Sequence, residues 1–186
     1  MNTSTFSIAL VSLFAALVAV FGLIPKIDLP LGVPITMQTL GVMLAGCLLG
    51  PKRGAQALLL FLAAVALGLP LLSGGRGGVA PFFAPAAGYL LAWPLGAFVA
   101  GCVMALMPTH TPRQSAIAAF AASLVGGLLV VHVCGVVGLV NIANLSWEQA
   151  ILGTLVFVPG DLIKCALTAT VVHTVARGLP DWQLGR

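Results

Sequence analysis

Charged residues are scarce in this sequence. Only 6% of its 186 residues are Asp, Glu, Lys or Arg, whereas 60% are hydrophobic. A soluble domain carries about 25% charged residues, because its surface has to be solvated. The shortage of charge therefore excludes a soluble protein and places the chain in a lipid bilayer. The net charge of +4 is spread thinly and forms no basic patch for nucleic acid.

Strict alternation of apolar and polar residues is also missing, which excludes a transmembrane β-barrel. In a bilayer the remaining solution is a helical bundle, because helices satisfy their own backbone hydrogen bonds. Each span needs about 20 residues, so this length allows five or six spans and leaves no room for a nucleotide-binding domain. We therefore predict an all-α integral membrane protein with six transmembrane helices in a single domain, residues 1–186. The expected spans are residues 6–24, 36–50, 54–69, 84–107, 115–140 and 160–177.

Motifs for metals, nucleotides and redox chemistry are missing as well. The four cysteines lie inside apolar runs without a CxxC pair, as expected of small buried hydrophobic residues. The glycine-rich stretch near residue 75 lacks the GxxxxGK[ST] spacing of a P-loop. A lone histidine in the fifth span, His132, is more often a satisfied interior side chain than a ligand, so no role is predicted for it. We expect no metal, no cofactor and no catalytic residue.

One acid and one base lie together inside the last hydrophobic run, as Asp161 and Lys164. Placing a charge at membrane depth costs about 2.5–3.5 kcal/mol, so the pair needs partners or a function. Residues 149–177 would form a helix of about 43 Å, longer than a hydrocarbon core of about 30 Å. We therefore predict a break at Pro159-Gly160, with a short helix before it and both charges on one face just after it. The anion that Lys164 requires is either Asp161 or an acidic ligand.

Two loops contribute further polar groups. Thr36 and Gln38 stand at the mouth of the second span, where they either hydrogen-bond a ligand or cap the helix. Residues 70–78 form a loop in which Gly74 and other glycines surround Arg76. Glycine allows the backbone to approach a ligand closely, so this loop either closes over a ligand or is a flexible exposed hairpin.

Aromatic residues are few, and two of them mark the start of the fourth span. Tyr89 and Trp93 are one helical turn apart and share a face. Such a pair either lines an apolar pocket or belongs to the aromatic belt at the membrane interface.

The few cations indicate the topology. With six spans, five cations fall on one side of the membrane and two on the other, which places both termini in the cytoplasm. The cytoplasmic set is Lys52, Arg53, Arg113, Arg177 and Arg186, and the outer set is Lys26 and Arg76. The two polar loops and the Asp161/Lys164 pair then meet at the outer side. Mostly apolar walls with a few polar groups suit a compact ligand bearing one acidic tail.

Several segments, in the same order along nearly the whole chain, carry a family resemblance. They are residues 33–42, 50–55, 68–70 with 73–78, 88–90 and 159–164. Together they resemble the biotin-specific substrate-binding (S) component of energy-coupling-factor transporters, the BioY family. The match is weaker at residues 84–89, where Ala86 and Ala87 stand in place of the family's usual Thr and Gly.

The resemblance implies a bacterial cytoplasmic (inner) membrane protein that binds biotin at its outer face and is not itself an enzyme. It implies two partners, a membrane-embedded coupling subunit (T component) and cytoplasmic ATPases. It implies that ligand contacts come from Thr36, Gln38, Gly74, Arg76, Tyr89, Asp161 and Lys164. It also implies that small residues of the first span, Ser12, Ala15, Ala16 and Ala19, contact the coupling subunit. Their spacing permits close helix approach.

Three alternatives remain at this stage. The same architecture could serve another vitamin or a biotin precursor, because pocket walls set specificity. An intramembrane enzyme could use Asp161 as an acid or base, but it would want a second carboxylate, and Asp28, Glu148 and Asp181 look like loop or tail residues. Finally, Asp161 and Lys164 could be a purely structural ion pair.

Overall fold

The structure is a computed structural model that describes residues 3–29, 32–180 and 182. Helices account for most of these residues, and the pairings outside them are two isolated β-bridges, Ile27 with Ile35 and Leu72 with Arg76. The α-helices are α1 (Thr3–Gly22), α2 (Gln38–Ala66), α3 (Ala87–Leu106), α4 (Pro112–Ala122), α5 (Val131–Ile142), α6 (Trp147–Leu155) and α7 (Val158–Gly178). A 3-10 turn (Ala80–Phe82) precedes α3, and a π-helical segment (Ser123–Val130) joins α4 to α5.

The helices are those of a multi-pass membrane protein. Within the described residues, four helical stretches are long and apolar enough to cross a bilayer, and α6 with α7 adds a fifth if that bent pair is one span. The all-helical membrane fold predicted from the sequence is thus confirmed. The expected number of six spans is not reached by length and composition, because α2 covers two of the predicted spans.

Helix α2 is interrupted at Gly50, whose φ of 82° and ψ of 179° are not helical. The break between the spans expected at residues 36–50 and 54–69 lies at Gly50, and Pro51 already opens the second arm of α2. A Cβ added to Gly54 would lie 2.9 Å from the carbonyl oxygen of Ala45. Residues nine apart in a straight α-helix are about 13.5 Å apart, so the second arm folds back on the first.

Helix α3 packs against both α2 and α5, and glycines bring these helices together. A Cβ on Gly88 would lie 2.7 Å from the Cα of Gly138 in α5. A Cβ on Gly46 of α2 would lie 2.5 Å from the carbonyl oxygen of Ala97 in α3. Between transmembrane helices, where lipid is as apolar as the side chains, such close backbone contact is the main source of packing energy.

The span expected at residues 115–140 is present as one helical stretch, Pro112–Ile142, but it is not uniformly α-helical. Its middle is the π-helical segment, which contains Gly126 and Gly127. A π turn holds more residues than an α turn, so every residue after it faces a different direction from that of a continuous α-helix.

The predicted break before the last span is confirmed in kind and shifted in position. Helices α6 and α7 meet at an angle of 49°, and α7 begins at Val158 rather than after Pro159-Gly160. Pro159 lies in the first turn of α7, where a backbone N–H has no intrahelical partner and its loss costs little. Asp161 consequently lies in the first turn of α7.

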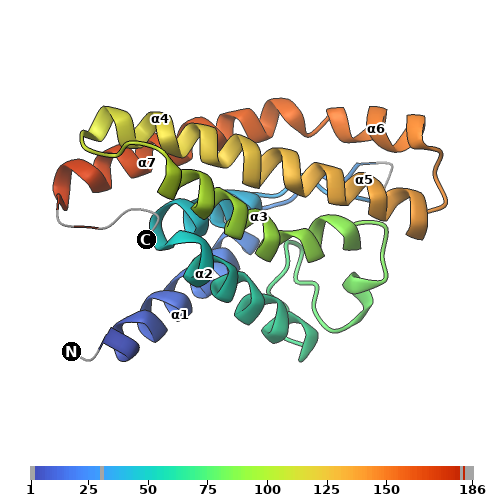
Figure 1. The fold of residues 1–186 in the computed structure, drawn as a ribbon. Coiled ribbons are helices and arrows are strands. Elements are labelled where there is room, and N and C mark those ends of the chain that lie inside the picture. Colours follow the sequence, from blue (N-terminus) through green and yellow to red (C-terminus); the bar gives the residue numbers. More distant parts are fainter. Residues whose placement is uncertain (1–2, 30–31, 181, 183–186) are drawn as a thin grey trace.

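The loops fall into two groups at opposite ends of the bundle (Figure 1). The start of α1, the α3–α4 connection and the end of α7 lie at the left of the view. The α1–α2, α2–α3 and α5–α6 connections lie at the right. The loops that the sequence analysis expected to meet are therefore at one end of the molecule.

Candidate functional site

A cavity opens at this loop end, with about 680 Å³ of empty space when its open mouth is included. Small-molecule sites are mostly apolar with a few converging polar groups, and this cavity has such a lining. Its apolar walls include Val33, Ile35, Leu72, Leu90, Trp93, Val131 and Phe157. Its polar residues are Thr36, Gln38, Thr39, Arg76, Tyr89, His132, Asp161 and Lys164.

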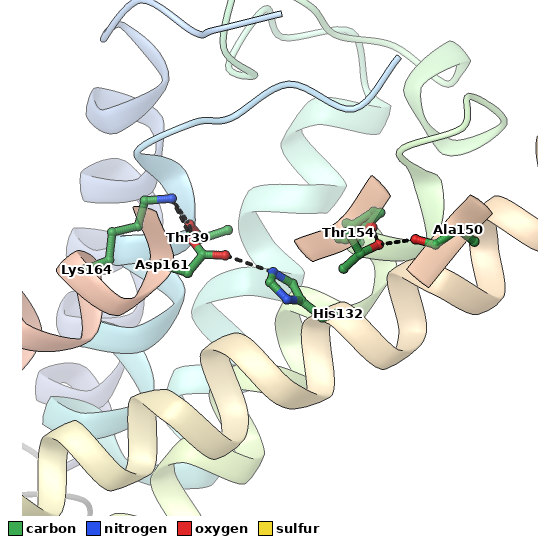
Figure 2. Close-up of polar contacts among 7 residues, drawn as sticks. Thr39, His132, Ala150, Thr154, Asp161 and Lys164 are labelled. Carbon is green, nitrogen blue, oxygen red and sulfur yellow. Dashed lines mark hydrogen bonds and ion pairs between the residues drawn. The ribbon is translucent and has the colours of Figure 1, made fainter. Parts of the chain in front are cut away.

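The carboxylate of Asp161 forms the centre of the polar cluster (Figure 2). Its Oδ1 accepts from the Lys164 ammonium at 2.8 Å and, more weakly, from the Thr39 hydroxyl at 3.4 Å. Its Oδ2 lies 2.8 Å from Nε2 of His132. Lys164 also donates to the Thr39 hydroxyl at 2.8 Å. Residues from α2, α5 and α7 thus converge on one carboxylate.

Burial makes these contacts important for stability. Asp161 is 4% exposed and Lys164 is 5% exposed. An uncompensated buried charge costs several kcal/mol, whereas a paired and hydrogen-bonded one costs far less. The anion that Lys164 requires is therefore Asp161 itself. The start of a helix also favours the ionised carboxylate.

His132 and Thr39 belong to this cluster, and the sequence analysis missed both. His132 is a buried, hydrogen-bonded histidine, as expected, but its partner is the carboxylate of the site. The direction of its side chain depends on the π-helical segment just before it, which the residue spacing does not reveal. The available signal was that an ionisable residue inside a span usually has a function.

Gln38 lines the cavity, but its polar atoms bind the protein. Its amide nitrogen donates to the carbonyl oxygens of Val18 (3.2 Å) and Leu71 (3.1 Å). Its amide oxygen accepts from the backbone N–H (3.0 Å) and the hydroxyl (3.2 Å) of Ser73. This buried side chain therefore ties α1 and the glycine-rich loop to the start of α2. Its contact with a ligand remains a prediction.

The glycine-rich loop places Arg76, but not Gly74, at the cavity. The Arg76 Nε donates to the carbonyl oxygen of Ser73 at 3.3 Å. Gly74 has a φ of 80° and packs against the other loop, since a Cβ there would lie 2.6 Å from Cε of Lys26. The role of Gly74 is thus to let the two loops approach each other, and any ligand contact from it remains a prediction.

Tyr89 and Trp93 both line the cavity and are buried, which favours the pocket alternative over an interfacial belt. The Tyr89 hydroxyl lies 2.5 Å from the hydroxyl of Thr154 in α6, and Thr154 in turn donates to the carbonyl oxygen of Ala150. The Tyr89 ring contacts the rings of His132 and Phe157 at centroid distances of 6.2 and 5.8 Å. These rings form one wall of the cavity.

The four small residues of α1 do not line the cavity, and they differ in exposure. Ser12 and Ala16 are exposed, Ala15 is buried and Ala19 is half-buried. Ser12 and Ala16 are one turn apart, so these two could meet another helix, whereas Ala15 packs inside the bundle.

The intramembrane-enzyme alternative requires a second carboxylate beside Asp161, and none of the described residues supplies one at the cavity. In the described part of the chain, Asp161 is the one carboxylate that lines the cavity. Glu148 is exposed, and Asp28 is exposed and paired with Lys26. Asp181 lies outside the described residues. No three of the described His, Cys, Asp and Glu residues cluster as metal ligands.

The fold and the cavity define a class: a multi-pass helical membrane protein with a mostly apolar cavity, lined by a few polar groups, at one end of its bundle. The sequence matches the model of the BioY family over residues 1–181. This chain belongs to the BioY family.

Relatives match along nearly their whole length. "Biotin transporter BioY" of Rhizobium etli is 43% identical over 95% of this chain and 96% of its own. "Biotin transporter BioY" of Rhodobacter capsulatus is 42% identical over 97% and 98%. A crystal structure described as the S-component for biotin from an ECF-type ABC transporter superposes with a TM-score of 0.83 at 32% identity. It covers 95% of this chain and 93% of the other.

Replacing Gln38 tests its role as a brace. In Gln38→Leu the Ser73 N–H and two carbonyl groups lose their partners, which costs about 1–3 kcal/mol for each buried group left unsatisfied. We expect a clearly lower unfolding temperature in detergent and faster proteolysis of residues 70–78. Gln56→Leu, at an exposed position of α2, is the matched control and should change neither. Equal behaviour of the two variants would contradict the bracing role.

Proposed function

We propose that this protein is the biotin-binding S component of an ATP-driven energy-coupling-factor transporter. The observation that carries the proposal is the cavity itself. It lies in a chain that matches two proteins named biotin transporters over nearly their whole length. The Asp161/Lys164 pair and Arg76 both line the cavity. Its other walls are mostly apolar and aromatic.

The chemistry of biotin complements these groups. Its ureido ring offers two N–H donors and a carbonyl acceptor, and its valerate tail ends in a carboxylate. Asp161 can accept only, so it takes the ureido N–H groups, while Lys164 donates to a ligand oxygen. The fused rings pack between side chains such as Trp93 and Phe157. Thr36 and Tyr89 complete the pocket, and Gln38 and Gly74 hold its loops.

Arg76 is the group best suited to the acidic tail. In the described residues its hydrogen bond uses Nε, and its two terminal nitrogens bind no side chain or backbone group there. A guanidinium presents a planar pair of donors that matches a carboxylate. Arg76 and Asp161 come from different segments of the chain and line the same cavity, so they can bind different groups of one ligand.

Six spans result if the two arms of α2 are counted separately and α6 with α7 is counted as one. The reversal of the chain at Gly50 supports this count. The start of α4, with Arg113, and the end of α7, with Arg177, then lie at the end of the bundle away from the α2–α3 and α5–α6 loops (Figure 1). Lys52 and Arg53 directly follow the reversal at Gly50, and Arg186 lies outside the described residues. By the positive-inside rule that end is cytoplasmic, so the cavity opens outward from the bacterial inner membrane and both termini are cytoplasmic.

Substitution of the buried pair tests the site. We expect Asp161→Asn and Lys164→Met each to weaken biotin binding at least 100-fold in isothermal titration of purified protein, because each removes a charged partner and leaves the other unpaired. Asp28→Asn and Lys52→Met are matched controls at positions outside the cavity and should bind as the unmodified protein does. An unchanged affinity in both buried variants would refute the site.

The same titration separates biotin from other ligands. Competition with riboflavin, thiamine and dethiobiotin asks whether another vitamin or a precursor is bound more tightly. A tighter competitor would replace biotin as the substrate and leave the architecture unchanged.

Arg76→Met tests the placement of the acidic tail. We expect biotin to bind about 10- to 100-fold more weakly to this variant, since a charged hydrogen bond contributes about 1.5–3 kcal/mol. Biotin amide, which has no carboxylate, should bind the variant and the unmodified protein almost equally. The measurement is the ratio of the affinities for biotin and biotin amide, compared between Arg76→Met and the unmodified protein. An equal loss for both ligands would show that Arg76 does not bind the tail.

A membrane-embedded T component and cytoplasmic ATPases would supply the energy, and α1 would meet the T component. Ser12 and Ala16 are the exposed small residues of that helix. We expect Ala16→Leu to reduce copurification with coexpressed T component and ATPases while biotin binding is retained, because a bulky side chain keeps the helices apart. Ala166→Leu, at an exposed position of α7, is the matched control. Undiminished copurification of Ala16→Leu would exclude this surface.

A further inference from the structure

His132 makes the one contact that reaches the second oxygen of Asp161 within the described residues. Lys164 and Thr39 both lie on Oδ1, whereas His132 Nε2 lies 2.8 Å from Oδ2. His132 and Asp161 come from α5 and α7, so the contact joins two helices. His132 is not part of the Asp161/Lys164 ion pair or of the proposed ligand contacts, so its role is still to be assigned.

The chemistry of the two groups determines the direction of this hydrogen bond. An ionised carboxylate can only accept, so Nε2 of His132 carries the proton and donates it to Oδ2. The ring itself is held in place, because its centroid lies 6.2 Å from the centroids of both Tyr89 and Phe157. His132 is therefore an oriented donor rather than a mobile one.

The consequence concerns the orientation of the carboxylate. With Lys164 alone, the Asp161 carboxylate could turn about its Cβ–Cγ bond until both oxygens approach the ammonium, a geometry that aims Oδ2 at Lys164 instead of at a ligand. A donor fixed on Oδ2 prevents that rotation. It holds the carboxylate between α5 and α7, with one lone pair of Oδ2 free and only the weak Thr39 contact beside Lys164 on Oδ1.

We infer that His132 is a positioning residue that orients Asp161 to accept N–H groups of the ligand. This inference rests on the proposed function, since it needs a ligand whose N–H groups meet Asp161. It predicts that ligand binding requires an N–H donor to Asp161 at residue 132 but does not require an imidazole ring there. Glutamine supplies a comparable donor, because its amide nitrogen reaches about as far from Cα as Nε2 of histidine.

The test compares biotin affinity in His132→Gln and His132→Leu by isothermal titration. We expect the glutamine variant to bind within about threefold of the unmodified protein and the leucine variant to bind about 10- to 100-fold more weakly. His173→Leu, elsewhere on α7, is the matched control and should bind normally. If leucine prevents folding, His132→Met replaces it, because a flexible apolar side chain fills the same space.

A second measurement needs no ligand. In protein labelled with ¹⁵N-histidine, the His132 signal, assigned by its loss in His132→Gln, should show a protonated Nε2. Asp161→Asn should shift that signal and leave those of His110 and His173 in place. An Nε2 without a proton would overturn the inference.

The outcomes separate this inference from the proposed function. Normal biotin binding by His132→Leu, or failure of His132→Gln to exceed it, would overturn the positioning role while biotin remained the ligand. Absence of biotin binding to the unmodified protein would refute the proposed function and the positioning role with it. The histidine signal would then still report whether His132 donates to Asp161.

Discussion

A carboxylate buried at one end of an apolar bundle constrains the rest of this structure. Asp161 is 4% exposed, so its charge has to be balanced by protein groups. Lys164, Thr39 and His132 supply those groups from three different helices. Because the cost of an unpaired charge is high, α2, α5 and α7 are held in one arrangement. The cavity beside the carboxylate is a consequence of that arrangement.

The polar loops are fastened by a second buried group. Gln38 bonds simultaneously to α1 and to the glycine-rich loop. This brace holds the loop that carries Arg76, which lines the cavity. The cavity thus combines one charged group held by ionic contacts with another whose loop is held by a neutral amide. Elsewhere the helices are held close together by glycine contacts such as that of Gly88 with Gly138. This close packing fixes the shape of the cavity.

Similarity to biotin transporters extends over nearly the whole chain, which agrees with a site assembled from segments far apart in the sequence. Some residues from each of the segments 33–39, 72–76, 86–93, 131–132 and 157–164 line the cavity. A local motif could be shared by unrelated proteins, whereas this set requires the complete fold. Membership of the BioY family and the arrangement of the cavity therefore support each other.

The sequence by itself determined the membrane environment, the helical class and the importance of Asp161 and Lys164. Scarcity of charge and unbroken apolar runs are properties of composition, and a charge inside such a run is conspicuous in any fold. Tertiary structure decided which groups meet the carboxylate and which hold the loops. His132 reaches Asp161 only because the π-helical segment changes the direction of α5. Gln38 turns inward only because the loop carbonyl of Leu71 accepts a hydrogen bond from its amide nitrogen. Hydrogen bonding between distant segments depends on how helices pack, and residue spacing along one helix carries no information about that packing.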